Sequence, residues 1–186
     1  MKEFLKAIHP VSDELLDEYL SHWKPFTADK DVLLTQNGDT EKYLYYVLEG
    51  IQKSYYLQDG KEHIIAFTYA PSFSGIPESF MLQKPSQYNL KTITKSSFLR
   101  ISYTSQQKLL AENPPLETLF RKGTEVLLAQ TLQRYYELMA YDIEKRFTLF
   151  CKRSPHMLQL VSNKDIASYL NINVNNFSKL LNSVKI

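Results

Sequence analysis

The chain has 186 residues, of which 44% are hydrophobic and 23% are charged, a composition typical of a soluble globular protein. This length suffices for one or two domains with a substantial core, and the formal net charge of +2 requires any nucleic-acid-binding surface to be local. The single cysteine, Cys151, excludes a disulfide framework or a thiolate metal site within one chain. No apolar run approaches membrane-spanning length and the first residues lack a signal-peptide pattern, so we expect a cytoplasmic protein without a membrane partner.

The N-terminal segment, residues 3–24, predicts a helix with one apolar face. Pro10 interrupts this pattern because a proline ring is not tolerated inside a helix, and Ser12 can cap the turn that follows. We expect this segment to serve packing only.

The sequence pattern changes from helical to strand-like between residues 24 and about 103. Short strand-like runs alternate there with turn signals, and Asp59-Gly60 lies between two alternating runs, as in a β-hairpin. Many short strands without helices between them predict an antiparallel barrel or sandwich. Residues 76–87 break the strand rhythm, which fits either a ligand-binding insertion or a plain connection.

The chain is helical from Ser105 onward. A short helix starts at Ser105, Pro114-Pro115 separates it from the next, and a long helix is predicted from Leu116 to about Cys151. We expect this long helix to be the longest element of the molecule.

The long predicted helix carries a sustained apolar stripe whose steps of three and four residues are typical of a coiled-coil seam. Packing on the barrel would bury one side, so a second apolar side predicts a partner helix, most simply that of a second copy of the chain. The alternative is a helix buried wholly against its own chain. The residues predicted for the dimer interface are Leu128, Leu132, Tyr135 and Met139.

The last stretch, residues 161–186, predicts two short helices joined by a tight turn. Ser162 can cap the first helix, Asn171 tolerates the left-handed conformation of a helix stop, and Asn173 can cap the second helix. This is the pattern of a helix-turn-helix, whose second helix enters the DNA major groove. Two capped amphipathic helices also occur in any helical protein, and that alternative stays open at this point.

Residues for catalysis or metal binding are not clustered in the sequence. The four histidines are not paired at ligand spacing, and only His63 falls among the predicted strands. A phosphate-binding glycine loop, a nucleophile elbow and a cysteine–histidine pair are all missing. We therefore expect no enzyme, no metal site and no cofactor.

The order of these elements resembles the Crp/Fnr superfamily of bacterial transcription regulators, of the catabolite activator type. The motifs that carry the resemblance are YLYYVLEGIQKSYYLQDGKEHIIAFTYAPSFSG, IEKRFTLFCKRSP and VSNKDIASYLNINVNNFSKLL, and the last two are similar to the short Crp-like regulators common in Bacteroidetes. The resemblance implies an α+β fold with a double-stranded, jelly-roll-like β-roll of the cyclic-nucleotide-binding type, a dimerisation helix and a helix-turn-helix of the winged-helix type. The implied domains are residues 1–115, 116–151 and 152–186.

The predicted effector loop departs from the pattern of cyclic-nucleotide binders in this family. In these relatives the loop after a Phe-x-Gly supplies a Glu for the ribose and an Arg-Ser pair for the cyclic phosphate. Here the Glu position falls on Ile76 and the Arg-Ser position on Ser86-Gln87, and the nearby Lys84 is out of register. A buried phosphate needs a cation or several donors, so we expect no cyclic AMP.

An iron–sulfur cluster is not expected either, because the N-terminal cysteine cluster of the oxygen-sensing branch is missing. The roll can still hold an unknown small-molecule effector. The residues predicted for effector binding are Gly75, Ile76, Glu78, Ser86 and Gln87.

The predicted recognition helix also departs from its relatives, which carry a Glu, a Ser-Arg pair and a further basic residue. The matching positions are Asn175, Ser178-Lys179 and Leu181. Asn can bond adenine and Lys can reach guanine or a phosphate, so contact with double-stranded DNA is retained while base reading is altered. The residues predicted for DNA binding are Asn173, Asn175, Asn176, Ser178, Lys179 and Asn182.

Lys164, Lys179 and Lys185 make the terminal stretch locally basic. The printed sequence stops at Ile186, directly after the second helix, so we expect any wing to precede the helices or to be absent. The leading hypothesis is a homodimeric DNA-binding transcription regulator of the Crp/Fnr type. The alternatives are a ligand-sensing or protein-interaction module with degenerate DNA reading and, third, a metal-dependent barrel enzyme.

Overall fold

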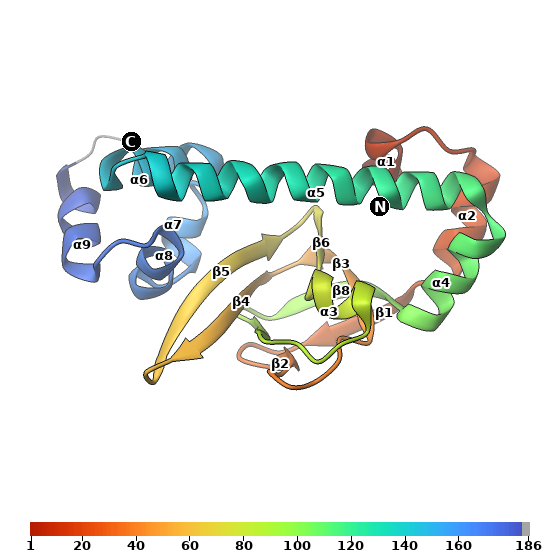
Figure 1. Ribbon diagram of the computed structural model, residues 1–186, viewed down its shortest axis with the longest axis horizontal. Helices are drawn as coiled ribbons and strands as arrows, with labels where there is room; N and C mark the ends of the chain where they lie inside the picture. Colours follow the sequence, from red (N-terminus) through yellow and green to blue (C-terminus); the bar gives the residue numbers. More distant parts are fainter. Residues whose placement is uncertain (184–186) are drawn as a thin grey trace. The chain divides into compact units, whose positions relative to one another are not determined.

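The computed structural model describes residues 1–183, and Figure 1 shows the order of their elements. The helices are α1 (Lys2–Ile8), α2 (Asp13–Ser21), α3 (Pro77–Leu82), α4 (Tyr103–Glu112), α5 (Pro114–Ala140), α6 (Ile143–Arg153), α7 (Met157–Leu160), α8 (Asn163–Leu170) and α9 (Val174–Ser183). The strands are β1 (Lys24–Ala28), β2 (Leu33–Thr35), β3 (Tyr43–Glu49), β4 (Ile51–Gln58), β5 (Lys61–Tyr69), β6 (Ser72–Ser74), β7 (Asn89–Thr92) and β8 (Ser96–Ser102).

The chain divides into two compact units. The first comprises Met1–Ser54 and Phe67–Leu128, and the second comprises Tyr55–Ala66 and the chain from Ala129 onward. Helix α5 runs across this division, and so does the β4–β5 hairpin, whose tip belongs to the second unit. The three domain ranges expected from the sequence therefore remain a prediction.

The strands form two four-stranded sheets, in the orders β1-β8-β3-β6 and β2-β7-β4-β5. In the first sheet β8 pairs antiparallel with β1 and with β3, and β3 pairs antiparallel with β6. The alternation of side chains along β3 supplies two cores, because successive residues of a strand point to opposite faces. Tyr45 and Val47 belong to a cluster inside the roll, and Tyr46 belongs to a cluster beneath the helices.

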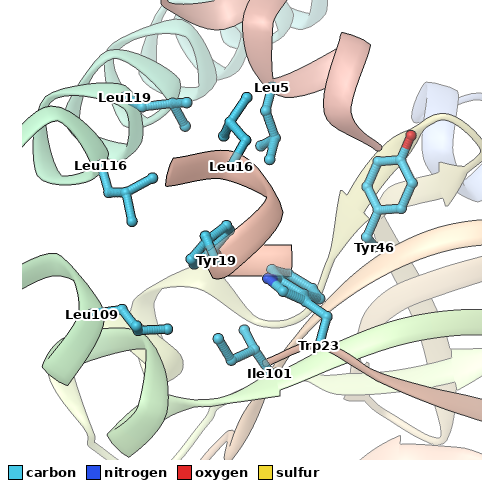
Figure 2. Close-up of a cluster of buried hydrophobic side chains, with 9 residues drawn as sticks. All are labelled: Leu5, Leu16, Tyr19, Trp23, Tyr46, Ile101, Leu109, Leu116 and Leu119. Atoms are coloured by element: carbon cyan, nitrogen blue, oxygen red, sulfur yellow. The ribbon is translucent and has the colours of Figure 1, made fainter. Parts of the chain in front are cut away.

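The cluster beneath the helices is the main core of the first unit (Figure 2). It joins side chains of α1, α2, α4 and α5 to the outer face of the first sheet. Each large apolar side chain that is fully buried stabilises the fold by about 1.5–3 kcal/mol relative to exposure. The residues of this cluster are Leu5, Leu16, Tyr19, Trp23, Tyr46, Ile101, Leu109, Leu116 and Leu119.

The predicted turn at Asp59-Gly60 has the expected geometry, and a second turn, at Gly50, also depends on glycine. Asp59 and Gly60 both have positive φ angles, 52° and 70°, as the favoured two-residue hairpin turn requires. Gly50, between β3 and β4, has φ of 91°, and a Cβ atom there would come within 2.6 Å of the Lys95 carbonyl oxygen. Only glycine fits this turn without displacing backbone.

The helix predicted for residues 3–24 is two helices, α1 and α2, separated around Pro10 as the sequence indicated. Ser12 caps α2, its hydroxyl oxygen accepting a hydrogen bond from the Leu15 amide at 3.3 Å. The short helix after the roll begins at Tyr103 with Ser102 as its cap, two residues before the predicted start.

The prediction of one long helix from Leu116 to about Cys151 is wrong. Helix α5 ends at Ala140, and α6 starts at Ile143. Asp142 causes the break, because its carboxylate accepts a hydrogen bond from the Lys145 amide at 2.8 Å and so caps a new helix. The 27 residues of α5 still span about 40 Å.

The winged part of the prediction is not seen. Residues 152–183 form helices and turns, with no strand among them. The predicted range 152–186 ends outside the described residues, as does Lys185. Among residues 1–183, no helix combines the length and the apolar character needed to cross a bilayer.

Candidate nucleic-acid interface and effector site

Local hydrogen bonds define the two helices of the predicted helix-turn-helix. The Ser162 hydroxyl oxygen accepts from the Asp165 amide at 3.1 Å, which caps α8 as predicted. Asn171 ends α8 in the left-handed region, with φ of 51°. The Asn173 side chain accepts from the Asn175 amide at 2.9 Å at the start of α9. The sequence therefore fixes both ends of the turn, as these residue types predict.

Buried apolar side chains hold α8 and α9 against α6. Phe177 of α9 is fully buried and contacts Phe147 of α6 edge to face, with ring centres 5.4 Å apart. The remaining buried side chains of the pair are Ile166, Ala167, Leu170 and Ile172. Because these contacts occupy one side of α9, its opposite side faces outward.

Two arginines from outside the α8–α9 pair donate hydrogen bonds to the C-terminal end of α8. Arg134 of α5 donates to the Tyr169 carbonyl, and Arg146 of α6 donates to the Leu170 carbonyl at 2.9 Å. The last carbonyls of a helix lack partners within it and carry partial negative charge, so cations are favoured there. The sequence interpretation missed these anchors because both arginines are distant in the chain.

The predicted DNA-binding side chains lie on the outward side of this pair. All six are exposed: Asn173, Asn175, Asn176, Ser178, Lys179 and Asn182. Asn175, Lys179 and Asn182 are spaced along one face of α9. The Ser178 hydroxyl, by contrast, donates to the Val174 carbonyl at 3.0 Å, within its own helix.

The tip of the β4–β5 hairpin contacts the same helix pair. The Ser168 hydroxyl of α8 accepts from the Ile64 amide at 3.0 Å and donates to the Glu62 carbonyl at 3.2 Å. A single side chain thus bonds two backbone groups of β5. Nothing in the local sequence around Ser168 predicts this contact, because it depends on tertiary packing.

The predicted effector residues lie around α3 and the loop after it, and their environments differ. Ile76 is 1% exposed and directly precedes α3, whereas Glu78 is exposed in the first turn of that helix. Gly75 has φ of 147° and lies between β6 and Ile76. Of these three residues, only Ile76 is buried, in the apolar cluster inside the roll.

The other two predicted effector residues lie in the loop between α3 and β7. Ser86 is 3% exposed, and its hydroxyl bonds the amide and the carbonyl of Tyr88, at 2.9 and 2.8 Å. Gln87 is exposed, and its carbonyl accepts from the Asn37 side chain at 2.8 Å. The Ser86 hydroxyl is therefore already engaged by its own loop.

The inside of the roll holds a carboxylate that the sequence interpretation missed. Glu41 is 2% exposed, and the Thr35 hydroxyl donates to its Oε2 at 2.5 Å. Its Oε2 also lies 4.0 Å from the position that a Cβ atom would take at Gly75. Burial raises the pKa of Glu41, while hydrogen bonds from Thr35 and from nearby backbone amides oppose that rise.

A guanidinium was missed as well. Arg100 of β8 lies between two rings, 4.1 Å from the centre of Phe26 and 4.3 Å from that of Tyr43. Register explains this position, because Arg100 pairs with Tyr45 on β3. Tyr45 faces the inside of the roll, so Arg100 does too.

Two hollows of residues 1–183 lie away from the predicted effector residues. One, of about 240 Å³, is lined by Lys42, Tyr43, Gln83, Ser102, Tyr103 and Thr104. The other, of about 360 Å³, lies along α6 and is lined by Asp142, Glu144, Lys145, Thr148, Leu149 and Lys152. Within residues 1–183, no group of three or more His, Cys, Asp or Glu side chains could hold a metal ion.

The predicted dimer stripe is strongly exposed along α5. Leu128, Leu132, Tyr135 and Met139 have exposed fractions of 59%, 58%, 63% and 71%. Their spacing keeps them on one side of the helix. The alternative of a helix buried wholly against its own chain is therefore wrong, since this side is uncovered in the single chain.

The chain is similar to known proteins in part of its sequence and in its fold. Residues 26–113 match the family model of the cyclic nucleotide-binding domain. No curated protein sequence matches the chain significantly. FixK2 from Bradyrhizobium japonicum is 20% identical, with a TM-score of 0.73 over 86% of this chain and 83% of that one.

Two further solved structures have the same fold over most of their length. The c-di-GMP responsive global regulator CLP from Xanthomonas campestris is 20% identical, with a TM-score of 0.67 over 92% of this chain and 90% of that one. The Thermus thermophilus catabolite activator protein is 15% identical, with a TM-score of 0.60 over 95% of this chain and 84% of that one.

Together with the order of the elements, these matches show the fold, a domain of the cyclic nucleotide-binding type followed by short helices that end in the α8–α9 pair. The chain as a whole shares its fold with FixK2 and with the Thermus thermophilus catabolite activator protein, so the predicted α+β fold with a roll of the cyclic-nucleotide-binding type is confirmed.

Proposed function

We propose that the protein is a DNA-binding transcription regulator of the Crp/Fnr type that acts as a homodimer on double-stranded DNA. The observation that carries this proposal is the outward face of α9, where Asn175, Lys179 and Asn182 are exposed while Phe177 is buried on the opposite side. The Asn and Lys side chains suit contacts with adenine, guanine or phosphate. We infer a regulator and assign it no catalytic role.

Dimerisation through α5 follows from the exposed apolar stripe of that helix. Leu132 and Met139 are 58% and 71% exposed, and an apolar seam of this length is unusual on a free surface. A second copy of the same helix supplies a matching seam by two-fold symmetry. Such a dimer would present two copies of α9 to successive major grooves of one DNA site.

The proposed effector of the roll is not cyclic AMP. Ile76, at the position where relatives carry a Glu, is buried and offers no hydrogen bond to a ribose. Ser86 and Gln87, at the position of the Arg-Ser pair, supply no cation. The guanidinium of Arg100 faces the inside of the roll from β8, between the rings of Phe26 and Tyr43, and is not part of this loop. Desolvating a cyclic phosphate at the loop without a cation is costly.

A mobility-shift experiment tests DNA binding. The full chain is titrated into genomic fragments at two salt concentrations, with random DNA as competitor. We expect at least one fragment to resist competition, and we expect Lys179→Ala to weaken the shift while Lys108→Ala, an exposed position on α4, leaves it unchanged. If no fragment competes better than random DNA, the regulator hypothesis fails.

A second candidate function is a ligand-sensing or protein-interaction module with degenerate DNA reading. The observation that favours it is that Lys179 is the single cation in α9. Sequence-specific readers commonly rely on Arg for guanine, and α9 has none. The same mobility shift distinguishes the two, because the second candidate predicts no preferred fragment at either salt concentration.

A further inference from the structure

We propose that the β-roll contains an anion site that is occupied by the chain's own Glu41, so that an external anion cannot use its donors. Donors from two segments converge on this one carboxylate, the Thr35 hydroxyl of β2 and the Tyr43 amide at the start of β3. The inference rests on the proposed function only in treating the roll as the effector domain.

The donors are of two kinds. The Thr35 hydroxyl donates to Oε2 at 2.5 Å, and the Tyr43 amide donates to Oε1 at 3.2 Å. Oε2 also lies close to the segment before α3, 4.0 Å from the position that a Cβ atom would take at Gly75. Several oriented donors aimed at one buried point form an anion site, whichever molecule supplies the anion.

The backbone of Glu41 is held in place by a further side chain. The Glu41 amide donates to the Ser79 hydroxyl at 2.9 Å, and that hydroxyl donates to the Lys84 carbonyl at 2.6 Å. Ser79 is 1% exposed. These hydrogen bonds fix the backbone of Glu41, and the fixed backbone holds the carboxylate near its donors.

Arg100 faces the inside of the roll, but its guanidinium lies between the rings of Phe26 and Tyr43. In residues 1–183 the Glu41 carboxylate is bonded by Thr35 and Tyr43 and not by an ion pair. A buried carboxylate without a counter-ion is tolerated only where hydrogen bonds satisfy it. A second anion beside it would meet like charge in a dry environment and would find the donors engaged. The roll therefore disfavours the binding of anionic effectors at this site, and any effector bound there is neutral or cationic.

Removing the carboxylate should turn this internal site into a site for a free anion. Glu41→Ala deletes a CH₂–COO⁻ group, which acetate matches in size and charge. The experiment measures the thermal unfolding midpoint of the full chain in sodium acetate and in sodium chloride of equal ionic strength. Wild type and Glu49→Ala, an exposed carboxylate on β3, serve as controls.

We expect Glu41→Ala to unfold at a lower temperature than wild type. Acetate at about ten times its dissociation constant should then raise the midpoint of this variant by about 3–6 °C relative to chloride. The midpoints of wild type and Glu49→Ala should be equal in the two salts. Equal midpoints for Glu41→Ala in acetate and chloride would overturn the proposal.

A second variant keeps the test decisive if Glu41→Ala does not fold. Thr35→Val preserves side-chain shape and removes one donor, so it should lower the midpoint in a chain that retains Glu41. A Thr35→Val protein as stable as wild type would contradict the proposal. A mobility shift on the same samples distinguishes failure of this proposal from failure of the proposed function. Wild-type protein that binds no DNA would refute the proposed transcription regulator and would leave the anion-site proposal standing.

Discussion

The guanidinium of Arg134 donates a hydrogen bond of 2.6 Å to the Tyr169 carbonyl and lies 3.6 Å from the centre of the ring of the same residue. Burial lowers the pKa of Arg134, and its interactions with Tyr169 oppose that change. Because Tyr169 belongs to the last turn of α8, this contact ties the first helix of the helix-turn-helix to α5.

Replacing Arg134 should loosen this unit. Arg134→Ala leaves the Tyr169 carbonyl without its donor and removes the cation–ring contact, so the free energy of unfolding should fall by about 1–3 kcal/mol. Urea unfolding followed by circular dichroism measures the difference. Arg121→Ala, which removes an exposed ion pair with Glu125, is the matched control and should cost about 0.5 kcal/mol or less. Equal losses for the two variants would show that Arg134 is only a surface residue.

Acid should destabilise the second unit through Glu137. Burial alone would raise the pKa of Glu137, but hydrogen bonds from Arg153, at 2.9 and 2.7 Å, and from Gln133 outweigh it, so the pKa is lower than usual. A carboxyl group with a lowered pKa in the folded state contributes stability above its unfolded pKa of about 4.3. That contribution is lost as the pH falls through the folded pKa.

Glu137→Gln removes this dependence. The difference in free energy of unfolding between wild type and Glu137→Gln should be largest near neutral pH and should shrink as the pH falls below about 4.3. Urea titrations at a series of pH values measure it, with the exposed Glu144→Gln as control. A difference that is constant with pH would mean that the ion pair with Arg153 contributes nothing to acid sensitivity.

Local rules predicted much of this fold. Ser162, Asn171 and Asn173 act on neighbours a few residues away, so their roles as caps and stop follow from residue type. The break at Asp142 was missed because the apolar steps continue from Met139 to Ile143 and hide the cap between them. A periodic pattern records which residues are apolar, and it does not record where the hydrogen-bond ladder ends.

The candidate sites were less predictable, because their chemistry depends on contacts between distant segments. Arg100 enters the roll through its register with Tyr45, fifty-five positions earlier in the chain. Glu41 comes close to Gly75, thirty-four positions later in the chain, only once the roll has folded. The family pattern drew attention to Ser86, whose hydroxyl the structure instead places on its own loop.

A charge in the α5 stripe should disrupt the proposed dimer. Leu132 is 58% exposed in the single chain, so Leu132→Glu should leave the folded protomer intact while placing two carboxylates at the two-fold seam. Size-exclusion chromatography with light scattering should give the mass of a dimer for wild type and of a monomer for the variant. Leu82→Glu, at a 62% exposed position on α3, should stay dimeric. A wild-type protein that is monomeric at micromolar concentration would refute the proposed dimer.

The salt dependence of DNA binding should reveal the role of Lys179. If this exposed lysine contacts a phosphate, Lys179→Ala removes two contacts per dimer, and the slope of log affinity against log salt should become shallower by about 1.8. Fluorescence anisotropy with a labelled fragment at several salt concentrations measures this slope, with Lys108→Ala as the matched control. Because a phosphate contact carries no sequence information, affinity should fall by the same factor for preferred and random DNA. A fall confined to the preferred fragment, with an unchanged slope, would instead place Lys179 at a base edge.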